Sequence, residues 1–387
     1  MKVGIAHVGM GFGGSEAAVM WGIEALREGH EVSVLTAGNV DFGALNAFHG
    51  TSIREGDVSL RRMPRLLRSV GRGDALRGGL FQRFCRGVAA EFDVLVSAYN
   101  PLDFGVPAIQ FVADFSWRRD VGEDLDPIPA AARRLIHRDG WLREAYLALG
   151  RRLARPSGRD VLAGADLLVA NSEFTATLLR ERLGVSDVAV VYPPVAGEAP
   201  HVAFEEREHG FVCVGRISHE KRIERIIEIL ARVRRLGHDV HLHVVGPIPD
   251  TPYGRFVRRL CDENRAWVFA EGGKAGAAKW QLLARHRYAI HGRPGEPFGI
   301  AVAEMAKAGC VTFVPSLGGP AEIAGDERVC YRDVDDAVRK IDAVLRDEPL
   351  QRKLSHDLRR RSRNFSAERF TPEFRRLVED FPGRRVA

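Results

Sequence analysis

Segments with the pattern of buried strands alternate with helical segments along this chain, in two successive series. The first series starts with a strand-like run at Lys2–Val8, a glycine turn and a helical spacing over Ser15–Glu28, and ends with a run at Val188–Tyr192. A second series starts at Phe211. Because alternating strands and helices favour a parallel, doubly wound sheet, the sequence predicts an α/β chain with two Rossmann-like halves. Ligands of such folds bind at the carboxyl ends of the strands, so the expected site is a cleft between the halves.

The alternation breaks over residues 196–209, where a stretch with Gly and Pro is followed by an acid-rich one. We therefore expect a first domain over 1–195, a linker over 196–209 and a second domain over 210–365. Residues 366–387 are expected to form a closing helix that crosses back to the first domain. The length of 387 residues also fits two domains.

Composition argues against several classes of protein. No apolar run approaches the roughly 18 residues that span a bilayer. The first residues lack the basic and apolar regions of a signal peptide, so we expect a cytoplasmic protein. The five cysteines are odd in number and form no C-x-x-C pair, which argues against a disulfide framework and against a thiolate zinc site.

The chain is basic, with a formal net charge of +6, and its arginines are clustered over 61–86, 133–159 and 359–363. Such clusters favour phosphorylated substrates, nucleic acid or an anionic membrane, and solvated helix faces are the alternative. The absence of aromatic stacking motifs argues against nucleic acid. Apolar residues interleave with the arginines of 61–86, which leaves peripheral contact with the inner face of a membrane open.

A glycine turn, Gly9-Met10-Gly11-Phe12-Gly13-Gly14, joins the first strand to the first helix. Glycines allow the backbone to approach a phosphate or a sugar, and the start of the helix attracts negative charge. A dinucleotide-binding fold would also place an acid at the end of the second strand, but none occurs before Asp41. The sequence therefore disfavours a dehydrogenase.

Two segments of the second half carry charges suited to a nucleotide sugar. Arg216 and Lys221 follow the strand that ends at Val214, where two cations can neutralise a diphosphate. Further on, Glu296 precedes a helix start and Glu304 lies about two turns along that helix. Two such carboxylates can bind the hydroxyls of a sugar and a ribose. The amides at the helix start, formed by Phe298, Gly299 and Ile300, can face a phosphate.

With these motifs the chain resembles a family 4 retaining glycosyltransferase of the GT-B fold, in which two Rossmann-like domains with parallel sheets face each other across a cleft. The resemblance covers essentially the whole chain. It rests on five segments in order: Gly11-Phe12-Gly13-Gly14, Val169-Ala170-Asn171-Ser172-Glu173-Phe174-Thr175, the G-R-x-x-x-E-K run from Gly215 to Lys221, the E-x7-E run from Glu296 to Glu304, and Gly318-Gly319-Pro320-Ala321-Glu322-Ile323.

The resemblance implies a hexosyltransferase that takes a UDP- or GDP-hexose and a hydroxyl acceptor, such as a glycan or a lipid-linked glycan of polysaccharide biosynthesis. Arg216 and Lys221 would bind the donor diphosphate, Glu296 the hexose and Glu304 the ribose. Gly299 and Ile300 would support the phosphate through their amides, and Gly13 and Gly14 would approach the donor phosphate or the acceptor. The first domain would bind the acceptor and the second the donor.

No cofactor is expected, and no metal ion either. Two D-x-D patterns, at Asp124 and Asp333, do not close a strand in a plausible nucleotide site. One departure from the family pattern matters, because Ala113-Asp114 stands where many members place a His. Asp114 or His291 are candidates for that role. Further candidate site residues are Ser172, Gly246 and Lys274, the last two as lining of a base pocket.

Two other functions remain open from the sequence. A sugar-nucleotide epimerase of similar two-domain fold would also need a diphosphate site. A non-catalytic binding protein could use the basic clusters alone, although the set of Arg216, Lys221, Glu296 and Glu304 argues against a decayed site.

Overall fold

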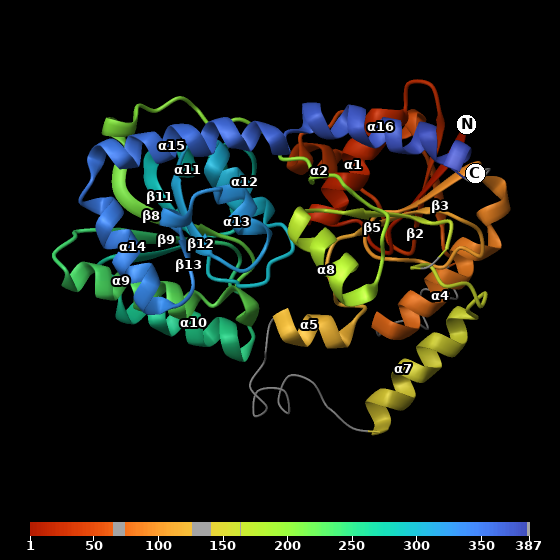
Figure 1. Cartoon of the computed structure of the whole chain (residues 1–387), viewed down its shortest axis with the longest axis horizontal. Coiled ribbons are helices and arrows are strands. Elements are labelled where there is room, and N and C mark those ends of the chain that lie inside the picture. Colours follow the sequence, from red (N-terminus) through yellow and green to blue (C-terminus); the bar gives the residue numbers. More distant parts are fainter. Residues whose placement is uncertain (65–73, 126–140, 163, 385–387) are drawn as a thin grey trace. The chain divides into compact units, whose positions relative to one another are not determined.

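The computed structural model describes residues 1–64, 74–125, 141–162 and 164–384 (Figure 1). The chain divides into two compact units. The N-terminal unit consists of Met1–Pro194 together with Ala367–Ala387, and the C-terminal unit of Val195–Ser366. Each unit contains one parallel sheet with helices, as the alternating sequence pattern predicts.

The sheet of the N-terminal unit has seven parallel strands in the order β3-β2-β1-β4-β5-β6-β7. The strands are β1 Lys2–Ala6, β2 Glu31–Thr36, β3 Ser59–Arg62, β4 Val94–Ser97, β5 Ile109–Val112, β6 Leu167–Ala170 and β7 Val188–Val190. From the centre of the sheet, β1, β2 and β3 follow one another toward one edge, and β4 to β7 follow one another toward the other edge. The carboxyl ends of β1 and β4 therefore flank the topological switch point, where ligands of such sheets bind.

The helices of this unit include one from the end of the chain. They are α1 Gly14–Leu26, α2 Phe42–His49, α4 Asp74–Gly87, α5 Arg119–Leu125, α7 Trp141–Ala154, α8 Glu173–Leu183 and α16 Ala367–Arg384, with short 3-10 turns at Glu55–Asp57 and Ala89–Glu91. Figure 1 shows α16 alongside α1. Phe374 of α16 is buried, stacks on Phe111 of β5 at a ring-centroid distance of 5.6 Å, and lies against Gly22 of α1.

The C-terminal unit repeats this topology with six parallel strands in the order β10-β9-β8-β11-β12-β13. The strands are β8 Glu208–Val214, β9 His241–Val245, β10 Val268–Gly272, β11 His286–Ile290, β12 Val311–Pro315 and β13 Cys330–Tyr331. Here the switch point lies between β8 and β11. The apolar runs of the sequence form these strands because both faces of a parallel sheet are covered by helices.

The helices of the C-terminal unit follow from amphipathic spacing. They are α9 Ile223–Arg235, α10 Pro252–Glu263, α11 Gly276–Arg285, α12 Ile300–Lys307, α13 Gly319–Ala324, α14 Val334–Leu345 and α15 Glu348–Ser362, with 3-10 turns at Phe204–Glu206, His219–Lys221 (η4), Glu327–Val329 and Arg363–Phe365. In α9, for example, Ile223, Ile226 and Leu230 are buried at helical spacing, while the exposed positions hold the charged residues Arg225, Glu228 and Arg235.

Two details differ from the boundaries drawn from the sequence. The edge strand β3 has no apolar run, because its residues face solvent. β8 begins at Glu208, so the last two residues of the expected linker belong to the second sheet. The helical segments that the sequence predicts from Val334 to Phe381 are the three helices α14, α15 and α16. Among the described residues, no helix combines the length and the apolar character that a membrane span requires.

Candidate functional site

Three neighbouring strands of the C-terminal unit end in glycines. Gly215, Gly246 and Gly272 follow or close β8, β9 and β10, with φ angles of 151°, 155° and 67°. The amide of Gly215 donates to Val245 O at 3.0 Å, and that of Gly246 donates to Gly272 O at 2.8 Å. A Cβ at Gly246 would lie 1.9 Å from the carbonyl oxygen of Gly215. Only glycine allows this approach, so the carboxyl edge of the sheet presents bare backbone.

Two loops at this edge are joined by an ion pair. Lys221 closes the short η4 turn after β8, and its ammonium donates to Oε2 of Glu296, in the loop between β11 and α12. Both side chains are largely buried, with exposed fractions of 16% and 13%. Nε2 of His291 lies 3.5 Å from the same oxygen, and Nη1 of Arg293 lies 3.4 Å from the other, Oε1. The two loops thus bring one carboxylate together with an ammonium, a guanidinium and an imidazole.

The charge state of this cluster follows from its surroundings. Burial opposes the ionisation of Glu296, but Lys221, His291 and Arg293 outweigh it and hold the pKa of Glu296 well below its usual range. Burial lowers the pKa of His291, and the cations Lys221 and Arg293 add to this effect while Glu296 opposes it. The cluster therefore holds an ionised carboxylate beside a neutral imidazole at neutral pH.

Arg216 follows Gly215 directly and differs from Lys221 in that it is exposed. It forms no ion pair with any residue that the structure describes, although its charge helps to lower the pKa of Glu220. An exposed guanidinium at the carboxyl edge of a parallel sheet is free to bind an anion with two parallel hydrogen bonds.

The loop that carries Glu296 is shaped by glycines on both sides. Gly295 and Gly299 have φ angles of 62° and 95°. Glu296 pairs with Gly318 in an isolated β-bridge, and its carbonyl accepts from the amide of Gly319 at 2.9 Å. A Cβ at Gly319 would lie 2.2 Å from Pro297 O, so this support also requires glycine. α12 starts at Ile300 without a side-chain cap, which leaves the positive end of the helix toward this loop.

Other predicted donor-binding residues have partners elsewhere in the C-terminal unit. Glu304 of α12 accepts from Nζ of Lys279 in α11 at 2.6 Å, an ion pair with no local signal in the sequence because it joins two helices. Phe298 is buried, and its ring packs edge-on against Phe365. Its side chain is therefore part of the core, which leaves its backbone as the part able to contact a ligand. Lys274 pairs with Glu271 at 2.9 Å.

The glycine turn of the N-terminal unit is accompanied by a chain of polar side chains. Nε2 of His7, at the end of β1, contacts Ser15 Oγ at 3.0 Å, and that hydroxyl donates to Glu16 Oε2 at 2.9 Å. Gly13 precedes α1 and Gly14 begins it, with no side-chain cap on the helix. A Cβ at Gly13 would lie 2.5 Å from Glu16 Oε2. Ser15 and Glu16 were not singled out from the sequence, although they follow the turn directly.

Asp114 lies at the carboxyl end of β5 and is held firmly. Its carboxylate accepts from Tyr99 at 2.9 Å, from Nδ2 of Asn100 at 2.8 Å and from the amide of Ser116 at 2.9 Å. The ring of Tyr99 lies 5.8 Å from that of His7, which links this group to the glycine turn. His7, Tyr99, Asn100 and Asp114 thus follow the carboxyl ends of β1, β4 and β5, around the switch point of the first sheet. Tyr99 and Asn100 carry no motif in the sequence.

Ser172 has a structural position. It is fully buried, and its Oγ accepts from the amide of Thr175 at 3.0 Å as the N-cap of α8. An N-cap of this kind stabilises the helix by about 1 kcal/mol. Asp333 of the second D-x-D pattern caps α14 in the same way, and Asp126 of the first lies outside the described residues.

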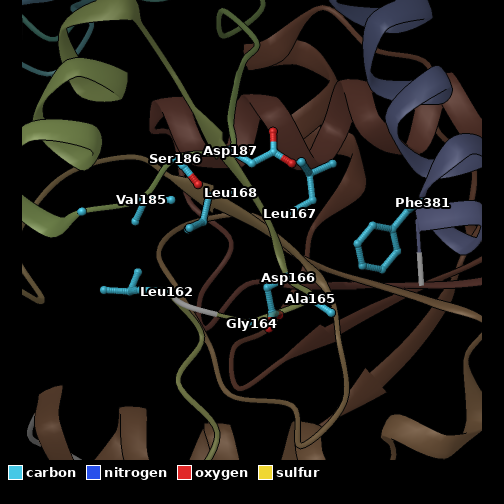
Figure 2. Close-up of a pocket in the computed structure, with 11 residues that line it drawn as sticks. Leu162, Gly164, Ala165, Asp166, Leu167, Leu168, Val185, Ser186, Asp187 and Phe381 are labelled. Atoms are coloured by element: carbon cyan, nitrogen blue, oxygen red, sulfur yellow. The ribbon is translucent and has the colours of Figure 1, made fainter. Parts of the chain in front are cut away.

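A pocket of about 250 Å³ lies at the opposite edge of the first sheet from the glycine turn. Figure 2 shows the side chains of Asp166, Leu168 and Asp187 around it, with Phe381 of α16 at one side. It opens at the amino-terminal ends of β6 and β7, which is not the edge where parallel sheets bind their ligands. None of the predicted site residues lines it.

Each of the three arginine clusters has members that form hydrogen bonds with other residues of the chain. In the first cluster, Arg86 donates to Asp103 at 2.7 Å; in the second, Arg159 donates to Asp166 at 2.8 Å. In the third, Arg361 donates to Glu322 O at 2.8 Å. Residues 65–73 and 126–140, which carry several more of these arginines, lie outside the described residues. Contact with an anionic membrane stays a prediction.

Comparison with known families gives two matches that follow one another along the chain. Residues 13–195 match the glycosyl transferase 4-like domain, and residues 198–365 match the glycosyl transferases of group 1. The second match contains the Lys221–Glu296 cluster, and the first begins at the last two residues of the glycine turn, Gly13 and Gly14. No curated protein sequence matches the chain.

Solved structures with a similar fold cover nearly the whole chain, at low sequence identity. WaaG, a glycosyltransferase involved in lipopolysaccharide biosynthesis, is 17% identical with a TM-score of 0.70 over 97% of this chain and 99% of its own. HepE of Anabaena in complex with UDP and glucose is 14% identical, with a TM-score of 0.68 and coverages of 98% and 100%. Sucrose-phosphate synthase of Thermosynechococcus elongatus is 16% identical, with a TM-score of 0.71 over 98% of each chain.

Proposed function

Because the chain belongs to the family 4 glycosyltransferases of the GT-B fold, we propose that it transfers a hexose from a nucleoside diphosphate sugar to a hydroxyl acceptor. The observation that carries this proposal is the cluster at the carboxyl edge of the C-terminal sheet. There the ionised Glu296 is paired with Lys221, next to the exposed Arg216 and the bare glycine ends of three strands.

The cations act on the departing diphosphate. When the bond between the anomeric carbon and the phosphate oxygen breaks, negative charge grows on the diphosphate. Arg216, Lys221 and the uncapped start of α12 stabilise that charge, which lowers the barrier to transfer. The acceptor oxygen bonds to the anomeric carbon on the face that the diphosphate leaves, and its proton passes to a phosphate oxygen. The anomeric configuration is then retained, and no metal ion is required.

The carboxylates act on the sugar hydroxyls. Glu296 stays ionised because of its three nitrogen neighbours, so it accepts hydrogen bonds from hexose hydroxyls throughout the reaction. Glu304, held by Lys279, is assigned to the ribose. Gly246 and Lys274, which follow β9 and β10, are assigned to the base pocket, and Gly13 and Gly14 to the approach of phosphate or acceptor.

The donor is assigned as a UDP- or GDP-hexose and the acceptor as a glycan or a lipid-linked glycan intermediate. Support comes from two structures of the same fold: HepE was solved with UDP-glucose, and WaaG takes part in lipopolysaccharide biosynthesis. A lipid-linked acceptor would also bring the protein to a membrane surface, which is where exposed arginines would have a partner.

A panel of nucleotide sugars tests this proposal. We expect UDP-glucose, UDP-N-acetylglucosamine or GDP-mannose to raise the melting temperature of the wild type, and to do so less for Arg216→Ala. With the stabilising donor and glycan acceptors, NMR should then detect a retained glycosidic product. Epimerised donor formed without any acceptor would instead identify an epimerase. Stabilisation by RNA alone, with no response to any donor, would favour a non-catalytic binding protein.

A further inference from the structure

A second cluster of ligating side chains lies at the amino-terminal edge of the C-terminal sheet, opposite the loops described above. Glu208 and His286 are the first residues of β8 and β11, and His241 is the first residue of the neighbouring β9. His243 follows two positions along β9. One ligating atom from each of these four residues lies within 4.8 Å of all the others.

Three of the four ligating atoms already have the spacing of a tetrahedral metal site. Nε2 of His241 lies 3.3 Å from Nε2 of His286 and 3.3 Å from Oε2 of Glu208. The third distance, from Nε2 of His286 to Oε2 of Glu208, is 3.4 Å. Zinc bonds of about 2.0–2.1 Å to nitrogen and oxygen, arranged as a tetrahedron, separate the ligands by about 3.3–3.4 Å.

Neighbouring groups leave two of the imidazoles with a nitrogen lone pair for a ligand. Nδ1 of His286 contacts Leu282 O at 2.8 Å, and because a carbonyl only accepts, this nitrogen must carry the proton. Nδ1 of His243 contacts Oε1 of Glu271 at 2.7 Å and donates in the same way. In both rings Nε2 is then unprotonated in the neutral form. A carboxylate or a carbonyl that orients an imidazole in this manner is typical of histidines that bind metals.

Without a cation, the hydrogen-bond acceptors of this cluster outnumber its donors. The lone pair of His286 Nε2 faces the carboxylate oxygen of Glu208, and one N–H from His241 can serve only one of these two acceptors. Arg285 neutralises the other oxygen of Glu208, through Nε at 3.0 Å, and leaves Oε2 directed to the imidazoles. A divalent cation between the three atoms would satisfy all of them at once.

The backbone makes room for this arrangement. Gly210 of β8 pairs with His241 across the sheet, and a Cβ at Gly210 would lie 2.2 Å from Nε2 of His241. Any other residue would push the imidazole away from His286. The cluster is also reachable, because the side chains of Glu208 and His241 are 34% and 26% exposed while His286 is fully buried.

We propose that the C-terminal unit binds one zinc ion at this edge, held by four side chains: Glu208, His241, His243 and His286. Imidazole nitrogens and a carboxylate form a ligand set that suits zinc rather than magnesium or calcium. The ion ties the amino ends of β8, β9 and β11 together. Its task is structural, because four protein ligands leave no open position for a substrate, and it lies at the opposite edge of the sheet from the proposed donor site.

The test uses the full chain without a histidine tag, stripped with a chelator and desalted. Zinc titrated against a chromophoric competitor should bind with one equivalent per chain. Cobalt should give the intense visible bands of a four-coordinate ion, and magnesium should not compete. Zinc at about 100 times its Kd should raise the melting temperature by about 5 °C or more. No binding of zinc or cobalt, or a cobalt spectrum typical of six ligands, would overturn the proposal.

Variants locate the ion. His241→Gln and Glu208→Gln should weaken zinc binding by at least 10-fold, and Glu271→Gln, which only orients His243, by about 10- to 100-fold. His356→Gln is the matched control, because His356 lies exposed on α15 outside the cluster. Circular dichroism of each metal-free variant checks that the fold is intact. Equal zinc affinity in the wild type and in all the cluster variants would show that the cluster is an imidazole network without a metal.

Discussion

Lys221 and Glu296 are 75 residues apart in the sequence, yet the ammonium of one donates directly to the carboxylate of the other. The pair joins the turn after β8 to the loop after β11, on the two sides of the switch point of the second sheet. In the proposed function, binding of an anion at Lys221 and of hydroxyls at Glu296 would therefore be coupled through one contact.

Removal of one member of this pair should be costly, because it leaves a largely buried charge without its partner. We expect Lys221→Met and Glu296→Gln each to lower the free energy of unfolding by on the order of 1–3 kcal/mol. The double variant should lose less than the sum, with a coupling of about 0.5–3 kcal/mol in urea denaturation. Lys353→Met is the control, since the exposed pair of Lys353 with Asp357 contributes about 0–1 kcal/mol. Additive losses would mean that the two residues do not interact in solution.

Arg216→Ala should separate catalysis from stability. The side chain is exposed and unpaired among the described residues, so its loss should change the free energy of unfolding by no more than about 0.5 kcal/mol. If Arg216 stabilises the leaving diphosphate, kcat should fall by about 10²- to 10³-fold. Arg258→Ala, an exposed arginine on α10, is the matched control for loss of charge. Turnover equal to the wild type in Arg216→Ala would remove this residue from the mechanism.

Gly246→Ala should destabilise the C-terminal unit. A methyl group there meets Gly215 O, and the φ of 155° is one that residues with a Cβ rarely adopt. The strain alone costs about 1–3 kcal/mol, and the clash adds to it. Gly273→Ala is the control, because a Cβ at that position meets no atom closer than 3.6 Å. Differential scanning calorimetry should show a lowered melting temperature for the first variant; equal melting temperatures would refute the close approach.

His291 should make stability depend on pH. Its surroundings are Lys221 and Arg293, which disfavour a second positive charge, and Glu296, which favours it; burial dominates and lowers its pKa. The unfolded chain, with a pKa of about 6.5, then binds more protons than the folded one in the window below that value. The contribution of His291 is therefore complete above about pH 6.5 and is lost as the pH falls.

Urea denaturation at about pH 7.5 and about pH 5.5 measures this effect. The loss of stability between the two values should be smaller in His291→Gln than in the wild type. Other buried histidines with a lowered pKa, such as His7, contribute equally to both proteins, so the difference isolates His291. The titration of Glu296 lies below this range. Identical slopes in the two proteins would contradict the lowered pKa.

Phe374→Ala should destabilise the N-terminal unit by about 3–5 kcal/mol, since the fully buried ring fills the space between Gly22 and Phe111. Arg376→Ala, two positions along the same helix and exposed, should change stability by less than about 0.5 kcal/mol. Chemical denaturation of the two variants provides the measurement. A small loss for Phe374→Ala would mean that α16 is not part of this core.

The elements that could be predicted from the sequence are those with a local signal. Strands such as Leu167–Ala170 and Val311–Pro315 are apolar runs between turn residues, and they form buried strands with these bounds. β3 was missed because an edge strand with Arg61 and Arg62 has no apolar pattern to detect. Arg216, Lys221, Glu296 and Glu304 could be singled out because each stands in a motif.

The partners of these residues could not be predicted, because contacts depend on strand order and register. Nothing local links Glu304 to Lys279 or Asp114 to Tyr99. The four residues of the proposed zinc site come from three strands. In the sequence, the only pattern that points to the site is His241-Leu242-His243, which places two histidines on one face of a strand. Parallel pairing brings them to Glu208 and His286.

The return of α16 to the first sheet has a consequence for biosynthesis. The N-terminal unit is interrupted in sequence by the whole of Val195–Ser366, so its last helix is made only after the second unit has been synthesised. At about 5–20 residues per second that delay is roughly 10–35 seconds. During this interval the face of α1 that receives Phe374 has no cover, whereas the C-terminal unit is one continuous segment of the chain. The half whose synthesis begins first therefore cannot complete its fold until the other half has been made.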